Sequence, residues 1–163
     1  MKKWIILLLC CLLLTGCDAT GAMETLGNVE HVSATQPVMR KIRLALPQDA
    51  TVLTMSGEDT IYLCQDYAIA VQVLPGGDLS GTIRSITGFE KDVLTVMETA
   101  CGDHKQYAFA WTAAAEAGDA VCRGVVLDDG NYHYALSLSA DAAAAPALKQ
   151  VWSDLLESFC LEG

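Results

Sequence analysis

The chain has little positive charge. It carries 10 basic and 20 acidic residues among 163, which gives a net charge of −10. Loss of Lys2 and Lys3 with a leader segment would leave 8 basic residues, and 8 − 20 gives −12. Phosphate repels a surface of this sign, so we expect no charge-driven binding of nucleic acid or anionic lipid. The acidity can also serve solubility alone, and a basic protein partner is electrostatically compatible.

Motifs for catalysis and metal binding are also missing. The sequence contains no C-x-x-C pair and no G-x-S-x-G elbow, and Gly57 and Gly81 stand alone rather than in a phosphate-binding loop. Asp128 and Asp129 offer too few oxygens for calcium, which takes about six to eight. We therefore expect no metal, no cofactor and no enzymatic activity.

The histidines and cysteines do not change that expectation. His31 and His104 lie in polar stretches, and His133 is expected opposite Val125 or Val126, away from any acid or thiol. Cys122 is expected beside Thr112 and Ser137, which favours a structural thiol over a nucleophile. An enzyme centred on Cys122 or His133 is the weakest of three functional hypotheses.

The longest apolar run is too short to cross a membrane. Residues 5–14 are uninterrupted by any polar residue and follow Lys2 and Lys3. As a helix they would reach about 15 Å, whereas a bilayer core is about 30 Å thick. This pattern is typical of the apolar core of an export signal.

The residues that follow resemble the lipobox of bacterial lipoproteins, and all four of its positions match: Leu14, Thr15, Gly16 and Cys17. The resemblance implies cleavage between Gly16 and Cys17, a diacylglyceryl thioether on Cys17, and acylation of the new amine. It also implies attachment to the outer face of the cytoplasmic membrane. The alternative is an ordinary secretory signal that ends near a cysteine.

Three segments follow from this interpretation. Residues 1–16 are the signal peptide, residues 17–37 are a lipidated cysteine and polar tether, and residues 38–163 form one globular domain. The domain holds four cysteines, which allow either two disulfides in three possible pairings or free thiols: Cys64, Cys101, Cys122 and Cys160.

Alternating apolar residues and turn signals predict a sheet. The expected strands are residues 40–46, 60–64, 67–74, 92–97, 106–113, 120–127 and 132–139. The clearest turn is residues 128–131, where Gly130 and Asn131 tolerate positive φ. Several strands are apolar on both faces, so both faces of the sheet should be at least partly covered.

Two helices complete the expected fold. A short helix should begin after Asp78 and end at Gly88, and an amphipathic C-terminal helix should begin near Pro146. The fold class is α+β, a twisted antiparallel sheet flanked by helices in a helix–sheet–helix sandwich.

One strand carries an aromatic stripe of Tyr107, Phe109 and Trp111, which alternates with small residues. If exposed, the stripe would form a patch for a ligand or a partner. The preferred interpretation is that it forms core beneath a helix.

Part of the chain, residues 40–161, resembles the PsbP-like sandwich family. The likeness lies in Ala110-Trp111, in the turn at 127–130 before residues 132–136, and in the ending at 151–159. Members include a photosystem extrinsic subunit and a nuclear-transport factor that binds a small GTPase. The resemblance implies a domain that binds and steadies other proteins, and it carries over no partner or catalytic residue.

The leading expectation is a membrane-anchored, non-enzymatic binding or assembly module with an unidentified protein partner. The alternative is a carrier of a small apolar ligand or cell-envelope fragment on the Tyr107, Phe109 and Trp111 face.

Overall fold

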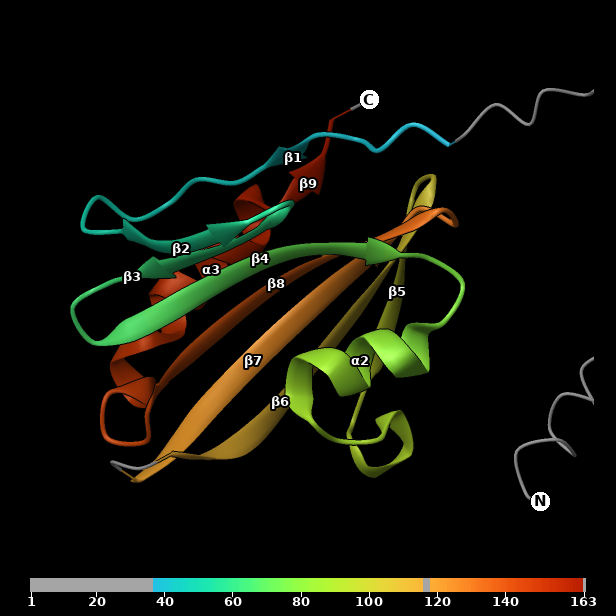
Figure 1. Ribbon diagram of the computed structural model, residues 1–163. Coiled ribbons are helices and arrows are strands. Elements are labelled where there is room, and N and C mark those ends of the chain that lie inside the picture. The colour runs from blue at the N-terminus through green and yellow to red at the C-terminus, as the bar shows by residue number, and fades with distance from the viewer. Residues whose placement is uncertain (1–36, 116–117, 163) are drawn as a thin grey trace, which may run out of the picture. The chain divides into compact units, whose positions relative to one another are not determined.

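The computed structural model describes residues 37–115 and 118–162. Within them, seven strands form one sheet in which every neighbouring pair is antiparallel (Figure 1). Their order across the sheet is β2-β3-β4-β8-β7-β6-β5. The strands are β2 (Thr51–Ser56), β3 (Asp59–Leu63), β4 (Tyr67–Pro75), β5 (Met97–Cys101), β6 (His104–Ala115), β7 (Gly118–Asp128) and β8 (Tyr132–Asp141).

Helices occupy two places in the described chain. The first pair, between β4 and β5, is α2 (Leu79–Thr87) and the 3₁₀ turn η1 (Lys91–Val93). The second pair, after β8, is η2 (Ala145–Leu148) and α3 (Lys149–Ser158). A separate two-stranded ladder pairs β1 (Ile42–Arg43) with β9 (Cys160–Leu161), so the two ends of the domain lie side by side. An antiparallel sheet with two α-helices agrees with the expected α+β class.

The local signals at α2 and at the β7–β8 turn are confirmed. The Asp78 carboxylate accepts a hydrogen bond from the Gly81 N–H at 2.8 Å, and Gly88 ends the helix at φ 77°. In the turn, the Asp128 carboxylate accepts from the Gly130 N–H at 2.8 Å, and Gly130 has φ 89°. At both places, contacts between residues close in the sequence are enough to determine the local structure.

Two apolar clusters lie on opposite faces of the sheet, because successive residues of a strand point to opposite sides. On the face called here the α3 face, Leu155 of α3 and Phe159, which follows the helix, belong to a cluster with Val125, Leu127, Leu136 and other residues of β4, β7 and β8. On the α2 face, Ile83 of α2 packs with Tyr107, Phe109, Val126 and Ala135.

Two predicted strands have wrong boundaries, and one observed strand was not predicted. Apolar and polar residues alternate in residues 40–46 because Ile42 and Leu44 pack against the cluster that contains Leu155, which is called the α3 cluster. Within this segment, ladder pairing is limited to Ile42–Arg43. Residues 92–97 include the 3₁₀ turn η1 instead of a strand, and β5 begins only at Met97. Strand β2 was missed because its residues are exposed on both sides and give no inward alternation.

Candidate functional site: a groove on the α3 face

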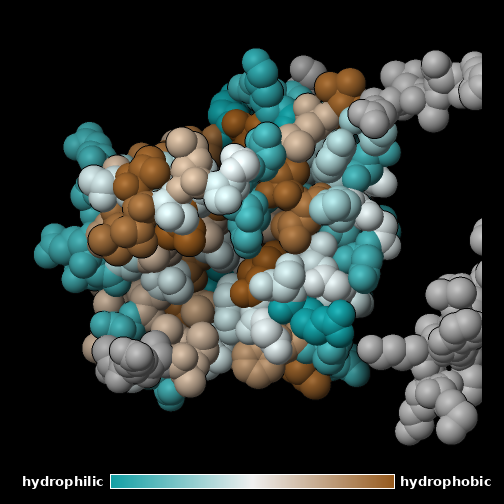
Figure 2. Space-filling model, viewed as in Figure 1, coloured by the Kyte–Doolittle hydropathy of each residue, from teal (hydrophilic) through white to brown (hydrophobic). Residues whose placement is uncertain are grey.

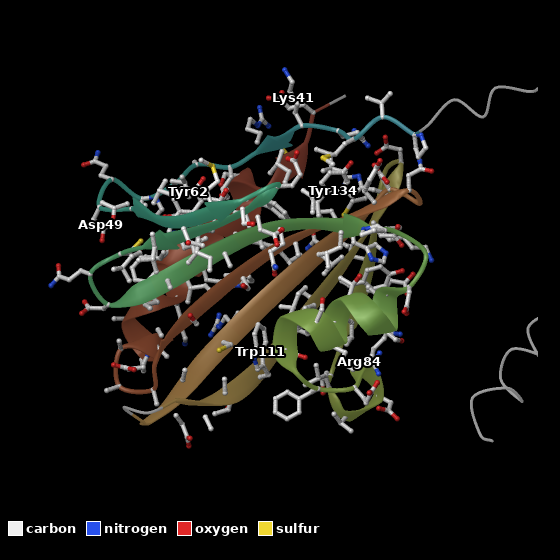
Figure 3. The ribbon with its side chains drawn as sticks, viewed as in Figure 1. Lys41, Asp49, Tyr62, Arg84, Trp111 and Tyr134 are labelled. Atoms are coloured by element: carbon white, nitrogen blue, oxygen red, sulfur yellow. The ribbon has the colours of Figure 1, made fainter. Side chains whose placement is uncertain are left out.

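The aromatic stripe of β6 lies on the α2 face. Tyr107 and Phe109 are 7% and 5% exposed and belong to the cluster around Ile83. Trp111 is half-buried at its margin, with its ring centroid 5.7 Å from that of Phe109 (Figure 3). Two of the three predicted patch residues therefore present almost no open surface to a ligand.

The opposite side of the same strand is hollow. Ala108 and Ala110 alternate with the aromatic residues, so their short side chains point to the α3 face. Together with Met97 of β5 they line a groove of about 610 Å³, which Trp152 of α3 also lines. The volume lies within the range of about 300–1,000 Å³ that is typical of small-molecule sites.

The packing of α3 explains why this groove stays open. Leu155, the buried residue of α3, belongs to a cluster with side chains from β4, β7 and β8, and this cluster contains no residue of β5 or β6 among those described. The helix therefore covers one half of the α3 face. The other half keeps apolar residues in water, and Val93 and Met97 are 67% and 64% exposed.

One cation lies in this groove. Arg123 of β7 is the single charged residue among the described residues that line it, and its side chain is half-buried. Its strand neighbours are Ala110 on β6 and Leu138 on β8. In the described part of the chain, Arg123 makes no ion pair and no side-chain hydrogen bond, whereas Arg40 and Arg84 each have a carboxylate partner.

A second exposed apolar surface lies at one edge of the sheet. Among the described strands, β2 pairs with β3 alone, and Val52, Leu53 and Met55 are 58%, 62% and 71% exposed. Figure 2 shows hydrophobic residues gathered over β2 and β3. The strand carries no charged residue, and its one irregularity is a register shift between Val52 and Thr54. An uncharged edge of this kind is able to pair with a further strand.

His133 has an acid opposite it, and the expectation that it would not is wrong. The hairpin register pairs His133 with Asp128, and the His133 Nε2 to Asp128 Oδ2 distance is 3.7 Å. On its other side, His133 Nδ1 lies 2.7 Å from the Thr82 hydroxyl of α2. His133 is 1% and Thr82 4% exposed, so the imidazole and the hydroxyl present almost no surface to a substrate, whereas the Asp128 side chain is 21% exposed.

The buried thiols Cys64 and Cys122 show no sign of activation, whereas the Cys160 sulfur accepts a hydrogen bond from Arg43 Nε at 3.2 Å. Cys64 and Cys122 are buried, Cys101 and Cys160 are half-buried, and all four are free thiols. Burial raises the pKa of the Cys64 and Cys122 thiols, which keeps them protonated and unreactive. The strand neighbours of Cys122 are Trp111 and Ser139, not Thr112 and Ser137 as expected, because both hairpin registers differ from those assumed.

The aspartates of the β7–β8 turn are structural. The Asp129 carboxylate accepts a hydrogen bond from the Tyr132 N–H at 2.8 Å and one from the hydroxyl of Tyr134 at 3.0 Å. The same hydroxyl accepts a hydrogen bond from the Arg40 N–H. Burial raises the pKa of Asp129, but these hydrogen bonds and the Arg40 charge outweigh it, so the pKa is lowered. Within residues 37–115 and 118–162 no three metal-binding side chains gather.

The predicted lipid-attachment residue Cys17 and the cleavage residue Gly16 lie outside the described residues, as do the signal peptide and all but the last residue of the predicted tether. Among the residues that are described, no helix has the length and apolar character needed to span a bilayer.

Comparison with known proteins places the fold. No family model matches the chain, and no curated protein matches it in sequence. The solution structure of the cyanobacterial PsbP protein (CyanoP) from Synechocystis sp. PCC 6803 matches with a TM-score of 0.57 at 10% identity, over 91% of this chain and 99% of that one. The domain has a PsbP-like fold.

A second match to this PsbP-like domain is LpqN, described as involved in cell envelope biogenesis of Mycobacterium tuberculosis. It has a TM-score of 0.53 at 13% identity, over 80% of this chain and 88% of that one. At such identities the likeness concerns the fold, and neither neighbour is described as an enzyme.

Proposed function

We propose that this protein is a lipid-anchored accessory module, held at Cys17 on the outer face of the cytoplasmic membrane, which binds another protein without catalysing a reaction. Its folded part would be a PsbP-like helix–sheet–helix sandwich enclosed by α2 and α3. The match of residues 14–17 to the lipobox supports the anchor. A structural neighbour described as involved in cell envelope biogenesis is compatible with that location.

The observation that carries the binding role is the exposed edge at β2. Backbone N–H and C=O groups on the free side of an edge strand can pair with a strand of a partner. Natural edge strands usually avoid this by placing lysine or proline there, and β2 has neither. The exposed side chains of Val52, Leu53 and Met55 would add apolar contact to such a pairing.

The anchor is tested by Cys17→Ala in cells. Without the sulfur no thioether forms, so the protein should be shed or remain uncleaved. Membrane fractionation and the mass of the N-terminal peptide report both outcomes. A variant that is cleaved and retained as before would remove the anchor from the proposal.

The binding edge is tested by placing a photo-crosslinking amino acid at Met55 of the full chain in its membrane. We expect one reproducible protein adduct, which is lost in Leu53→Lys because a charge on the edge opposes strand pairing. The same crosslinker at the exposed Gln150 of α3 is the matched control and should give no such adduct. An adduct that persists in Leu53→Lys would contradict the role of β2.

A ligand carrier is the second candidate, and the groove on the α3 face favours it. The expected ligand face of Tyr107, Phe109 and Trp111 lies mostly beneath α2. Any carrier function is therefore proposed for the opposite side of β6.

A further inference from the structure

We propose that the groove on the α3 face binds a small amphiphilic acid, with the carboxylate on Arg123 and an aliphatic chain along Ala108, Ala110 and Met97. This inference does not rest on the proposed protein-binding function, because it uses a different surface of the sheet. The juxtaposition that carries it is one guanidinium, without an acceptor among the described residues, in an open groove whose other described lining residues are uncharged.

The positive charge of Arg123 implies a negatively charged ligand. A half-buried guanidinium without an acceptor loses solvation on one side and gains no partner in return. Arg123 has five N–H donors, and the neighbours on its strand register are the apolar Ala110 and Leu138. A carboxylate can accept two parallel hydrogen bonds from this fork, which is the strongest arrangement that a guanidinium makes.

The charge balance favours a carboxylate over a phosphate. A single guanidinium compensates one negative charge, and no second cation lies among the described residues of the groove. A phosphate dianion would leave a charge uncompensated on a chain whose net charge is already −10. The matching ligand is therefore a monoanion.

The rest of the groove defines the body of the ligand. Val93 and Met97 are 67% and 64% exposed, and Trp152 adds an aromatic wall. Covering this surface with methylene groups would remove it from water, which favours a ligand with an aliphatic chain. The floor of short alanine side chains leaves depth for a chain, which a leucine at position 110 would occupy.

The experiment uses membranes that carry the full chain. They are incubated with a photoreactive dodecanoate that bears a diazirine at the end of its chain, then irradiated, and the labelled peptides are identified by mass spectrometry. The expected labels fall on peptides of β5 and β6, because the end of a chain that starts at Arg123 and follows Ala110 and Ala108 would lie beside Met97. A probe with the same chain and a terminal alcohol tests the need for charge.

Two variants and a matched control locate the site. Arg123→Gln removes the charge and Ala110→Leu fills the groove, and each should reduce labelling of these peptides by about tenfold or more, as expected for loss of a charge-assisted hydrogen bond or of the site. Arg84→Gln is the control, because Arg84 lies on α2 in an exposed pair with Glu90 (Figure 3). Its labelling should be unchanged, and resistance to proteolysis confirms that each variant is folded.

Several results would overturn the inference. These are equal labelling by the alcohol probe, unchanged labelling in both Arg123→Gln and Ala110→Leu, or no label on groove peptides above that of an unrelated membrane protein. Competition by unlabelled dodecyl phosphate as strong as that by dodecanoate would overturn the choice of carboxylate.

Discussion

The two faces of strand β6 differ in what covers them. On the α2 face, Tyr107 and Phe109 are packed against Ile83 and are almost fully buried. On the α3 face, Ala108 and Ala110 line an open groove, because α3 packs with β4, β7 and β8 and leaves this part of the sheet uncovered. A single strand thus contributes the interior of the protein on one side and its candidate binding surface on the other.

The comparison teaches where function can reside in this fold. Large side chains beneath a helix fill space and leave nothing for a ligand, so the conspicuous aromatic stripe belongs to the stability of the domain. The small side chains of Ala108 and Ala110 leave space, because α3 does not extend over this part of the sheet. The side of β6 that carries the small residues is therefore the side that is available for binding.

Phe109→Ala should reveal the largest difference in stability between the two faces of β6. Truncating this buried ring should lower the free energy of unfolding by about 3–5 kcal/mol, because it leaves a cavity on the α2 face. Urea-induced unfolding measures the change. The control is Met97→Ala on the groove side, which should alter stability by no more than about 0.5 kcal/mol. Similar losses in the two variants would mean that the faces are equally packed.

Gly124→Ala tests how tightly the α2 face is filled. A Cβ at Gly124 would lie 2.6 Å from Phe109 Cε2 and 3.2 Å from Trp111 Cζ3, so the aromatic rings would have to move. We expect a loss of about 1–3 kcal/mol from overpacking, measured as a lower thermal midpoint. Gly124→Ala combined with Phe109→Leu should lose less than the two changes summed. Strict additivity would show that the ring is not the cause.

Asp129→Asn differs from these core changes because its effect should depend on pH. The pKa of Asp129 is lowered in the folded state, so its contribution is present above the unfolded pKa of about 3.9 and is lost as the pH falls through the folded value. We expect a loss of about 1–2 kcal/mol at neutral pH, from weaker hydrogen bonds with Tyr132 and Tyr134. Unfolding curves of the wild type and of Asp129→Asn should differ at neutral pH and approach each other as the pH falls through the lowered pKa of Asp129. A difference that stays constant with pH would contradict this account.

The smallest effect is expected for Ala110→Leu. Because Ala110 is exposed at the floor of the groove, the larger side chain meets solvent and not packed atoms, and stability should change by no more than about 0.5 kcal/mol. Denaturant unfolding is again the measurement. A loss comparable to that of Gly124→Ala would mean that the groove is closed in solution.

Sequence reasoning succeeded where neighbouring residues decide the structure. Asp78 and Gly88 delimit α2 because a carboxylate satisfies free N–H groups and glycine adopts positive φ. The β6 alternation likewise follows from the two-residue period of a strand. The groove itself could not be predicted, because its opening depends on how far α3 extends across the sheet.

Register errors explain the other misses. The register assumed for the β7–β8 hairpin was shifted from the observed one, in which Asp128 faces His133. A shift of register changes every cross-strand neighbour. Strand β2 gave no periodic signal because neither of its faces is buried. The lipobox, by contrast, needs no tertiary structure, and it remains a prediction that only the fate of Cys17 can test.

The amino-acid sequence alone determined the turn at residues 128–131, the limits of α2 and the division of β6 into a large-residue side and a small-residue side, because each depends on residues close together in the chain. Only the tertiary structure decided that the large-residue side is buried, that the small-residue side opens into a groove, and that Arg123 stands in it without a described partner. Those outcomes depend on which distant elements pack against which face of the sheet, and no local pattern contains that information.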